Sequence, residues 1–241
     1  MGKRIIAQRR GTGSQRYRAH SFKFKGKAAH PSILEETRVG VILDFVKCAA
    51  HTAPLAVVDY GDETGLMLAC EGMRVGDDVS IGGNTDENVV ASLGNVVPLD
   101  QIPEGTLIYN IELKPGDGGK FIRASGTFGR VVTKSDAGVM VRLPSKQQKM
   151  FPPKCRAAIG VLAGGGRVDK PLLKAGIAHY KHKARNHLYP KTSASAMNAV
   201  DHPYGNKRTA RKSKAKPVSR DAPPGRKVGM VAARRTGRKK R

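Results

Sequence analysis

The two ends of this chain carry most of its positive charge. Residues 205–241 hold 15 Lys and Arg against one acid, and residues 1–38 hold 10 against two, in a chain of 241 residues with a net charge of +25. Segments so basic and so poor in apolar side chains cannot bury enough surface to offset the entropy lost on ordering. We therefore expect both ends to be extended when free and to fold against a polyanion, which points to a nucleic acid.

The charge of the central region is divided between two segments of opposite sign. Residues 39–112 hold two basic residues and 12 acids, whereas residues 113–204 hold 17 basic residues and four acids. Phosphate repels the first segment over most of its surface. We expect the acidic segment to face solvent or other proteins and the basic segment to contact the nucleic acid.

Several function classes are disfavoured by composition. The three cysteines, Cys48, Cys70 and Cys155, are far apart and form no CxxC pair, so we expect neither a disulfide framework nor a zinc site, and a reducing compartment. No run of 18 apolar residues occurs, and the basic N-terminus lacks the apolar segment of a signal peptide. We expect a soluble, intracellular protein with no membrane partner.

Short runs of strand length recur through the middle of the chain, separated by Gly, Asp and Pro turns at roughly 8 to 12 residue intervals. The runs cover residues 39–43, 55–58, 66–70, 79–81, 107–113, 131–133, 139–143 and 157–162. This pattern predicts an all-β fold, in which an OB-like barrel followed by an SH3-like barrel fits the strand count. Residues 86–102, with few strand signals, are the predicted joint. The predicted division is an N-terminal extension over 1–36, an OB-like barrel over 37–92, an SH3-like barrel over 93–168 and a C-terminal extension over 169–241, both extensions being long, basic and irregular.

A short helix is predicted within residues 170–187. Its apolar face would comprise Leu173, Ile177 and Tyr180. The other face would present Lys174, Lys181, Lys183 and Arg185. Such a face is either a solvated surface or a phosphate contact, and the excess of basic over acidic residues in this stretch favours the phosphate contact. The spacing of His179, His182 and His187 could suggest a metal, but no carboxylate or cysteine nearby completes a ligand set.

Residues 112–119 join a strand to a glycine-rich turn. Backbone N–H groups in such turns can line up as an anion nest, although an ordinary hairpin turn explains the pattern as well. No Gly-Lys-Ser/Thr string and no GxGxxG string opens a helix here, which argues against a nucleotide cofactor.

Residues 197–205 form the most distinctive string. Asp201 beside His202 invites a catalytic interpretation, but neighbouring residues on an extended segment point apart, and no nucleophile has a recognisable context. A structural role is better supported, in which Asn198 and His202 make hydrogen bonds to RNA edges and 2′-hydroxyls. We predict no catalytic residue and no metal ligand.

These strings, together with residues 123–127, 154–157, 219–229 and 232–238, resemble in order the universal large-subunit ribosomal protein L-two family. Residues 2–11 are similar to its archaeal and eukaryotic branch, and the short chain favours an archaeon. The chain departs from the family after Tyr204, where Gly205-Asn206-Lys207 stands in place of several glycines.

The resemblance implies a non-enzymatic primary rRNA binder of the cytoplasmic ribosome. It implies that an extension approaches the peptidyl transferase region, supporting subunit association and translation. Implied partners are large-subunit rRNA, neighbouring ribosomal proteins and the small subunit, with the protein monomeric in the particle. No protein-bound cofactor is expected, although structural Mg²⁺ would sit on the RNA.

The predicted RNA contacts combine basic residues with the family string. They are Arg9, Arg10, Arg16, Arg18, Lys23, Lys25, Lys114, Arg123, Arg156, Lys181, Arg185, Asn198, His202, Gly205, Arg220, Arg226, Lys227, Arg234 and Arg235. Two alternatives remain open at this point. His202 could take part in peptide-bond chemistry, or the charge could serve a chromatin-like compactor of DNA.

Overall fold

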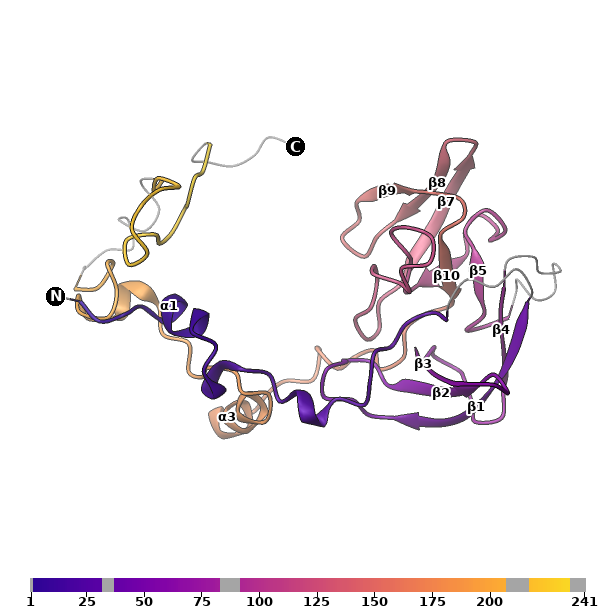
Figure 1. Cartoon of the computed structure of the whole chain (residues 1–241), viewed down its shortest axis with the longest axis horizontal. Coiled ribbons are helices and arrows are strands. Elements are labelled where there is room, and N and C mark those ends of the chain that lie inside the picture. The colour runs from indigo at the N-terminus through magenta and orange to yellow at the C-terminus, as the bar shows by residue number, and fades with distance from the viewer. Residues whose placement is uncertain (1, 32–36, 83–91, 207–216, 235–241) are drawn as a thin grey trace. The chain divides into compact units, whose positions relative to one another are not determined.

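The computed structural model describes residues 2–31, 37–82, 92–206 and 217–234, and within them the fold is mostly β (Figure 1). The strands are β1 (Arg38–Val46), β2 (Leu55–Asp59), β3 (Thr64–Leu68), β4 (Asp78–Ile81), β5 (Val96–Pro98), β6 (Leu107–Tyr109), β7 (Gly129–Ser135), β8 (Gly138–Arg142), β9 (Gln148–Phe151) and β10 (Arg156–Ile159). The helices are α1 (Ile6–Gly11) and α3 (Ala175–Ala184), with 3-10 turns at Gln15–Tyr17, Ser21–Lys23 and Ala194–Ala196. The all-β prediction is confirmed.

The strands join in one sheet of 10 strands, in the order β3-β2-β1-β4-β5-β10-β6-β7-β8-β9. Neighbours are antiparallel except β4 and β5, which pair in parallel through Ile81 and Val96. Register shifts interrupt the β1–β2 pair after Ile42 and the β7–β8 pair after Val131. Such bulges bend and twist a strand locally, so the sheet can curve around its side chains.

Two hydrophobic clusters lie along this sheet. One is built mainly from β1 to β4 around Ile42, Leu55 and Leu68, and the other mainly from β6 to β9 around Ile108 and Phe151. The strands in the middle serve both clusters, because successive side chains on a strand point to opposite faces. Val96, Tyr109 and Ala158 belong to the first cluster, and Val97, Ile108 and Ala157 belong to the second.

The predicted joint at residues 86–102 is only partly described, and its described end contains a strand that the sequence pattern does not reveal. β5 occupies Val96–Pro98 and is fully buried between neighbouring strands. A three-residue apolar run has no alternation to reveal it, because it is buried on both sides. The sequence also missed β9, a short strand with exposed polar side chains. Residues 86–91 lie outside the described residues.

The chain divides into two compact units with very different charge. The β unit, Ser21–Pro171, has a net charge of +1, whereas Met1–His20 and Leu172–Arg241 together form a basic unit with 26 Lys and Arg, two acids and a net charge of +24. Among the described residues of the basic unit, the buried apolar side chains are Ile5 and Ala178. The basic unit therefore has almost no core of its own.

The helix predicted within residues 170–187 is α3, but its predicted apolar face is wrong. Leu173, Ile177 and Tyr180 are 85%, 42% and 70% exposed, and Leu173 precedes the helix. The helix is buried through the small Ala178 instead. The larger side chains therefore project outward, although their spacing of four and three residues predicts a packed face.

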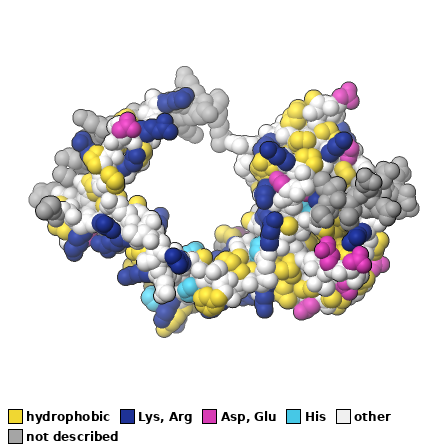
Figure 2. Space-filling view, viewed as in Figure 1, with side chains coloured by type: hydrophobic (Ala, Val, Ile, Leu, Met, Phe, Trp, Pro, Cys, Tyr) yellow, Lys and Arg dark blue, Asp and Glu magenta, His cyan; other side chains and the backbone are white. Residues whose placement is uncertain are grey.

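Exposed carboxylates gather over the part of the β unit that contains β1 to β4 (Figure 2). They belong to Asp44, Asp62, Glu63, Glu71, Asp77 and Asp78. Cys48, Cys70 and Cys155 are free and buried. No helix in the described part of the chain is long and apolar enough to cross a membrane.

Candidate nucleic-acid interface

The segment around residues 197–206 folds back on itself as a closed loop. The Asn198 carbonyl accepts hydrogen bonds from the backbone N–H groups of Asp201 (3.0 Å) and His202 (3.2 Å), and Asn206 N–H donates to the Met197 carbonyl (3.0 Å). Gly205 N–H donates to the His202 carbonyl (2.9 Å). Asn206 has φ +54°, a left-handed conformation that Asn tolerates better than most residues. The loop thus closes beyond Tyr204 with one glycine and one asparagine.

Gly205 is buried at the closest approach in this loop. A Cβ atom at this position would overlap the Asn198 carbonyl group and lie 2.6 Å from the Ala199 nitrogen. Both groups are backbone, so they cannot swing aside as a side chain could. The loop conformation therefore depends on the absence of a side chain at residue 205.

Gly205→Ala is expected to open the loop and weaken binding to large-subunit rRNA. Overpacking of this kind costs about 1–3 kcal/mol, or roughly 5- to 100-fold in affinity where binding needs the closed loop. Gly225→Ala is the matched control, because a Cβ there meets nothing within 4 Å. Equal affinity of the two variants, measured by filter binding, would show that the closed loop is not used.

His202 lies inside the loop with its ring fixed by local contacts. Its Nδ1 accepts a hydrogen bond from Tyr204 N–H (3.1 Å), and the two rings lie 5.1 Å apart. Burial lowers the His202 pKa below its ordinary value. A neutral ring that accepts at Nδ1 carries its proton on Nε2. In this tautomer Nε2 is therefore a hydrogen-bond donor and carries no lone pair with which to act as a base.

Asp201 forms an ion pair with Lys3, which also belongs to the basic unit. Its Oδ1 lies 4.0 Å from Lys3 Nζ, and the neighbouring Val200 carbonyl accepts a hydrogen bond from Lys3 N–H (2.8 Å). The pairing of Asp201 with Lys3 agrees with the expectation that Asp201 and His202, as neighbours on the chain, point apart and form no catalytic dyad. No local sequence pattern shows that residue 3 pairs with residue 200, because the pairing joins distant irregular segments.

The loop is also tied to the last part of the tail. Tyr204 Oη donates a hydrogen bond to the Val228 carbonyl (3.2 Å), and a parallel bridge joins Val218 to Val231. Arg220, Arg226, Lys227 and Arg234 lie exposed on this tail segment. Their side chains are therefore available to an anionic partner.

The glycine-rich turn does form an anion nest, but the anion is a side chain of the protein. The Glu112 carboxylate accepts hydrogen bonds from the N–H groups of Gly116 (3.2 Å), Gly118 (3.1 Å) and Arg156 (3.0 Å). Gly118 has φ +78°, which favours glycine. The turn amides that point at Glu112 are therefore occupied, and the turn contributes the exposed Lys114 instead.

Arg156, which the sequence places among the RNA contacts, is buried in the β unit. The residue is 5% exposed, and its guanidinium donates to the fully buried Glu112 (Nη2 to Oε1, 2.9 Å) and to the Pro31 carbonyl (2.8 Å). Burial alone would raise the Glu112 pKa, but hydrogen bonds and charge from Arg156 outweigh burial and lower it. Arg156 neutralises a buried carboxylate.

Arg123 is half-buried and holds the backbone of the β unit. Its guanidinium donates to the Gly119 carbonyl (2.8 Å) and the Ala28 carbonyl (2.6 Å). Much of its hydrogen-bonding capacity is thus used within the protein. Its predicted contact with RNA stays a prediction, limited to the exposed part of the side chain.

His30 lies beside this network and is buried as a neutral ring. Its Nε2 donates to the Asn110 carbonyl (2.6 Å), and its enclosed Nδ1 has no partner in the described structure. Burial, reinforced by the charge of Arg156, lowers the His30 pKa from 6.5 to about 4. The folded state therefore resists protonation that the unfolded chain accepts.

We expect this difference to destabilise the fold as pH falls from 6.5 to 4. In this window the unfolded state binds the extra proton, so stability is complete above 6.5 and decreases towards 4 by about 3 kcal/mol, at about 1.4 kcal/mol per unit. Urea denaturation at several pH values measures the loss. His30→Gln keeps a donor without a titrating ring, and an identical pH dependence in this variant would exclude His30 as the cause.

The structure exposes most of the other predicted contacts. Arg9, Arg10, Arg16, Arg18, Lys181, Arg185 and Asn198 are exposed in the basic unit, and Lys23, Lys25 and Lys114 are exposed in the β unit. His202 is half-buried and Gly205 is buried. Arg235 lies outside the described residues. The exposed cations of the basic unit come from both ends of the chain, which the sequence had treated as separate extensions.

Comparisons with known proteins match this chain to ribosomal proteins. A family model described as "Ribosomal Proteins L2, C-terminal domain" matches residues 92–222. The chain is 50% identical over 239 residues to "Large ribosomal subunit protein uL2" of Archaeoglobus fulgidus, covering 98% of this chain and 99% of that relative. It is 46% identical to the uL2 proteins of Natronomonas pharaonis and Methanococcoides burtonii, covering 99% of this chain and 97% and 100% of theirs.

Matches of this extent define a ribosomal protein, which is a structural protein and not an enzyme. The chain belongs to the uL2 family, in its archaeal branch. The resemblance that the sequence strings indicated is confirmed.

Proposed function

We propose that this chain is a structural constituent of the large ribosomal subunit in the cytoplasm and binds large-subunit rRNA. The observation that carries the proposal is the basic unit, which has a net charge of +24 and two buried apolar side chains among its described residues. Such a unit lacks a core that could hold it together against charge repulsion. A folded RNA supplies both the counter-charge and the packing surface.

The finer assignments combine the two clusters and the loop with what the family resemblance implies. The first cluster is the core of an OB-like barrel and the second that of an SH3-like barrel. The closed loop at residues 197–206 approaches the peptidyl transferase region, where Asn198 and His202 support the active RNA conformation. The carboxylates over β1 to β4 face neighbouring ribosomal proteins, and the protein, present once in the particle, aids association with the small subunit. Structural Mg²⁺ belongs to the RNA.

Competition binding tests this proposal against a DNA compactor with the same charge. Labelled large-subunit rRNA is bound to the full chain at several salt concentrations and challenged with unlabelled rRNA or duplex DNA. A preference for folded rRNA that persists as salt rises supports the proposal, because phosphate contacts alone are lost with salt on any nucleic acid. Equal competition by duplex DNA would contradict it.

The idea that His202 performs peptide-bond chemistry conflicts with its ring geometry. We expect His202→Ala in assembled particles to leave the rate of a fast puromycin reaction within a few-fold of wild type. Proton transfer by a histidine contributes ~10²-fold or more. A loss of that size in correctly assembled particles would instead make His202 a catalytic group.

A further inference from the structure

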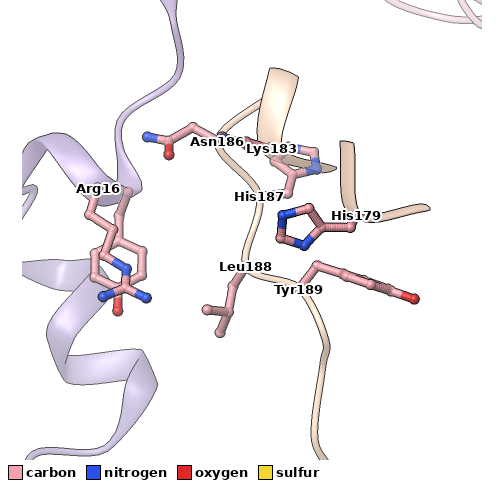
Figure 3. Close-up of a pocket in the computed structure, with 8 residues that line it drawn as sticks. Arg16, His179, Lys183, Asn186, His187, Leu188 and Tyr189 are labelled. Atoms are coloured by element: carbon pink, nitrogen blue, oxygen red, sulfur yellow. The ribbon is translucent and has the colours of Figure 1, made fainter. Parts of the chain in front are cut away.

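The basic unit contains a hollow built from both ends of the chain. Arg16 and Tyr17 of the N-terminal segment face the loop that follows α3, where His187, Leu188 and Tyr189 lie (Figure 3). Two adjoining cavities of about 140 and 570 Å³ are both lined by Tyr17 and residues 186–189. Neither lining contains an acidic residue. The larger cavity is within the range of small-ligand sites.

Asn186 fixes the two walls of this hollow. Its Nδ2 donates to the Gln15 carbonyl (2.7 Å) and the Arg18 carbonyl (2.8 Å), and its φ of +53° turns the chain out of α3. These two bonds hold the N-terminal segment against the loop after the helix. These contacts within the basic unit therefore define the shape of the hollow.

Aromatic rings form one side of the hollow. The Tyr189 ring stacks on His182 with centroids 4.8 Å apart and planes tilted by 12°, and His179 meets the same ring edge-on at 6.5 Å. His187 lies 6.1 Å from His182. A stack of flat rings within a cavity offers a surface for another flat ring.

Cations surround these rings. Arg10, Arg16, Lys183 and Lys191 line the two cavities. A ligand for this hollow must pair a flat ring with negative charge, and an unpaired nucleotide does both. No group of three or more His, Cys, Asp or Glu suited to a metal occurs among the residues described.

We propose that this hollow binds a single unpaired nucleotide of an RNA, the base against Tyr189 and its neighbouring rings and the phosphate against Arg10, Arg16 or Lys191. The proposal rests on the function proposed above and specifies one contact within it. Single-stranded RNA is read in this way, by stacking unpaired bases on aromatic side chains beside basic groups. A paired base in a helix cannot enter such a hollow.

The test uses the full chain with large-subunit rRNA and three tyrosine variants. Tyr189→Ala is expected to weaken binding roughly 5- to 100-fold, the range of one base stack, with the salt slope unchanged. Tyr189→Phe keeps the ring and should bind like wild type. Tyr180→Ala is the matched control, since Tyr180 lies on α3 just before this loop, is 70% exposed and lines neither cavity.

A second measurement locates the contact directly. Ultraviolet irradiation of the complex, followed by digestion and mass spectrometry, should find a nucleotide attached to the peptide that contains residues 186–189. Unchanged affinity of Tyr189→Ala together with no such adduct would overturn the nucleotide site. A loss of affinity in Tyr189→Ala that is accompanied by a lower salt slope would also overturn it, because the substitution would then have displaced the cations that contact phosphate. Failure of the wild-type chain to prefer rRNA would instead contradict the proposed function itself.

Discussion

Changing Arg220, Arg226, Lys227 and Arg234 together to Gln is expected to reduce the salt dependence of rRNA binding by about three units of logarithmic slope. Each phosphate contact contributes about 0.7 to 0.9 to that slope. At physiological salt the same change should weaken binding roughly a hundredfold or more. Affinity measured from low to high salt separates this effect from a loss of shape recognition, which lowers affinity without changing the slope.

The four residues were chosen because their environment leaves them free to meet phosphate. All are exposed, and the tail from residue 205 onward carries Asp221 as its one acid. Removal of residues 205–241 should flatten the salt dependence further, but it also removes Gly205 and opens the closed loop. The Gln variant tests charge alone because it leaves the loop and the Tyr204 contact with Val228 in place.

A matched control is available on the acidic side of the β unit. Lys47 and Arg74 are exposed and are the two basic residues of the acidic segment at 39–112. Lys47→Gln with Arg74→Gln should leave the salt slope unchanged, because the surrounding carboxylates repel phosphate. A slope that changes equally in both variants would mean that binding follows total charge and that the basic unit has no special place in it.

The features that the sequence predicted correctly are those with a local signature. β1, β2 and β8 follow from apolar or alternating runs of Val, Ile and Leu, because side-chain alternation and turn chemistry are set by neighbours in the chain. The family was identified because its strings are long and occur in order. The exposed cations of the tail follow from a count of charges, since a segment so poor in apolar residues cannot bury them in a core.

The features that the sequence missed depend on contacts between distant residues. Nothing local shows that Asn186 binds the backbone of residues 15–18, or that Lys3 pairs with Val200, so the two ends were predicted as separate extensions. The RNA contact of Arg156 was predicted from the family resemblance, which does not show how deeply the side chain is buried. Its partner, Glu112, lies 44 positions away and is completely buried, which no local pattern reveals.

Glu112→Gln is expected to destabilise the β unit by about 3–5 kcal/mol, the cost of leaving one partner of a buried ion pair uncompensated. The substitution preserves the shape of residue 112 but leaves the buried guanidinium of Arg156 without its counter-charge. It also weakens the acceptor for the N–H groups of Gly116 and Gly118, so the glycine-rich turn should loosen with it. Chemical denaturation of the full chain followed by circular dichroism measures the loss.

Two further variants show whether the pair, and not the position, carries this effect. Glu112→Gln with Arg156→Met removes both charges, and it should be less destabilised than the sum of the single variants by about 0.5–3 kcal/mol. Arg38→Gln breaks the exposed pair with Asp62, whose nitrogen and oxygen lie 3.4 Å apart, and should cost less than about 1 kcal/mol. If Glu112→Gln lowers the free energy of unfolding as little as Arg38→Gln does, then water reaches the pair of Glu112 and Arg156. Because the carboxylate holds both the turn amides and Arg156, a strictly additive double variant would place the stabilisation in the turn alone.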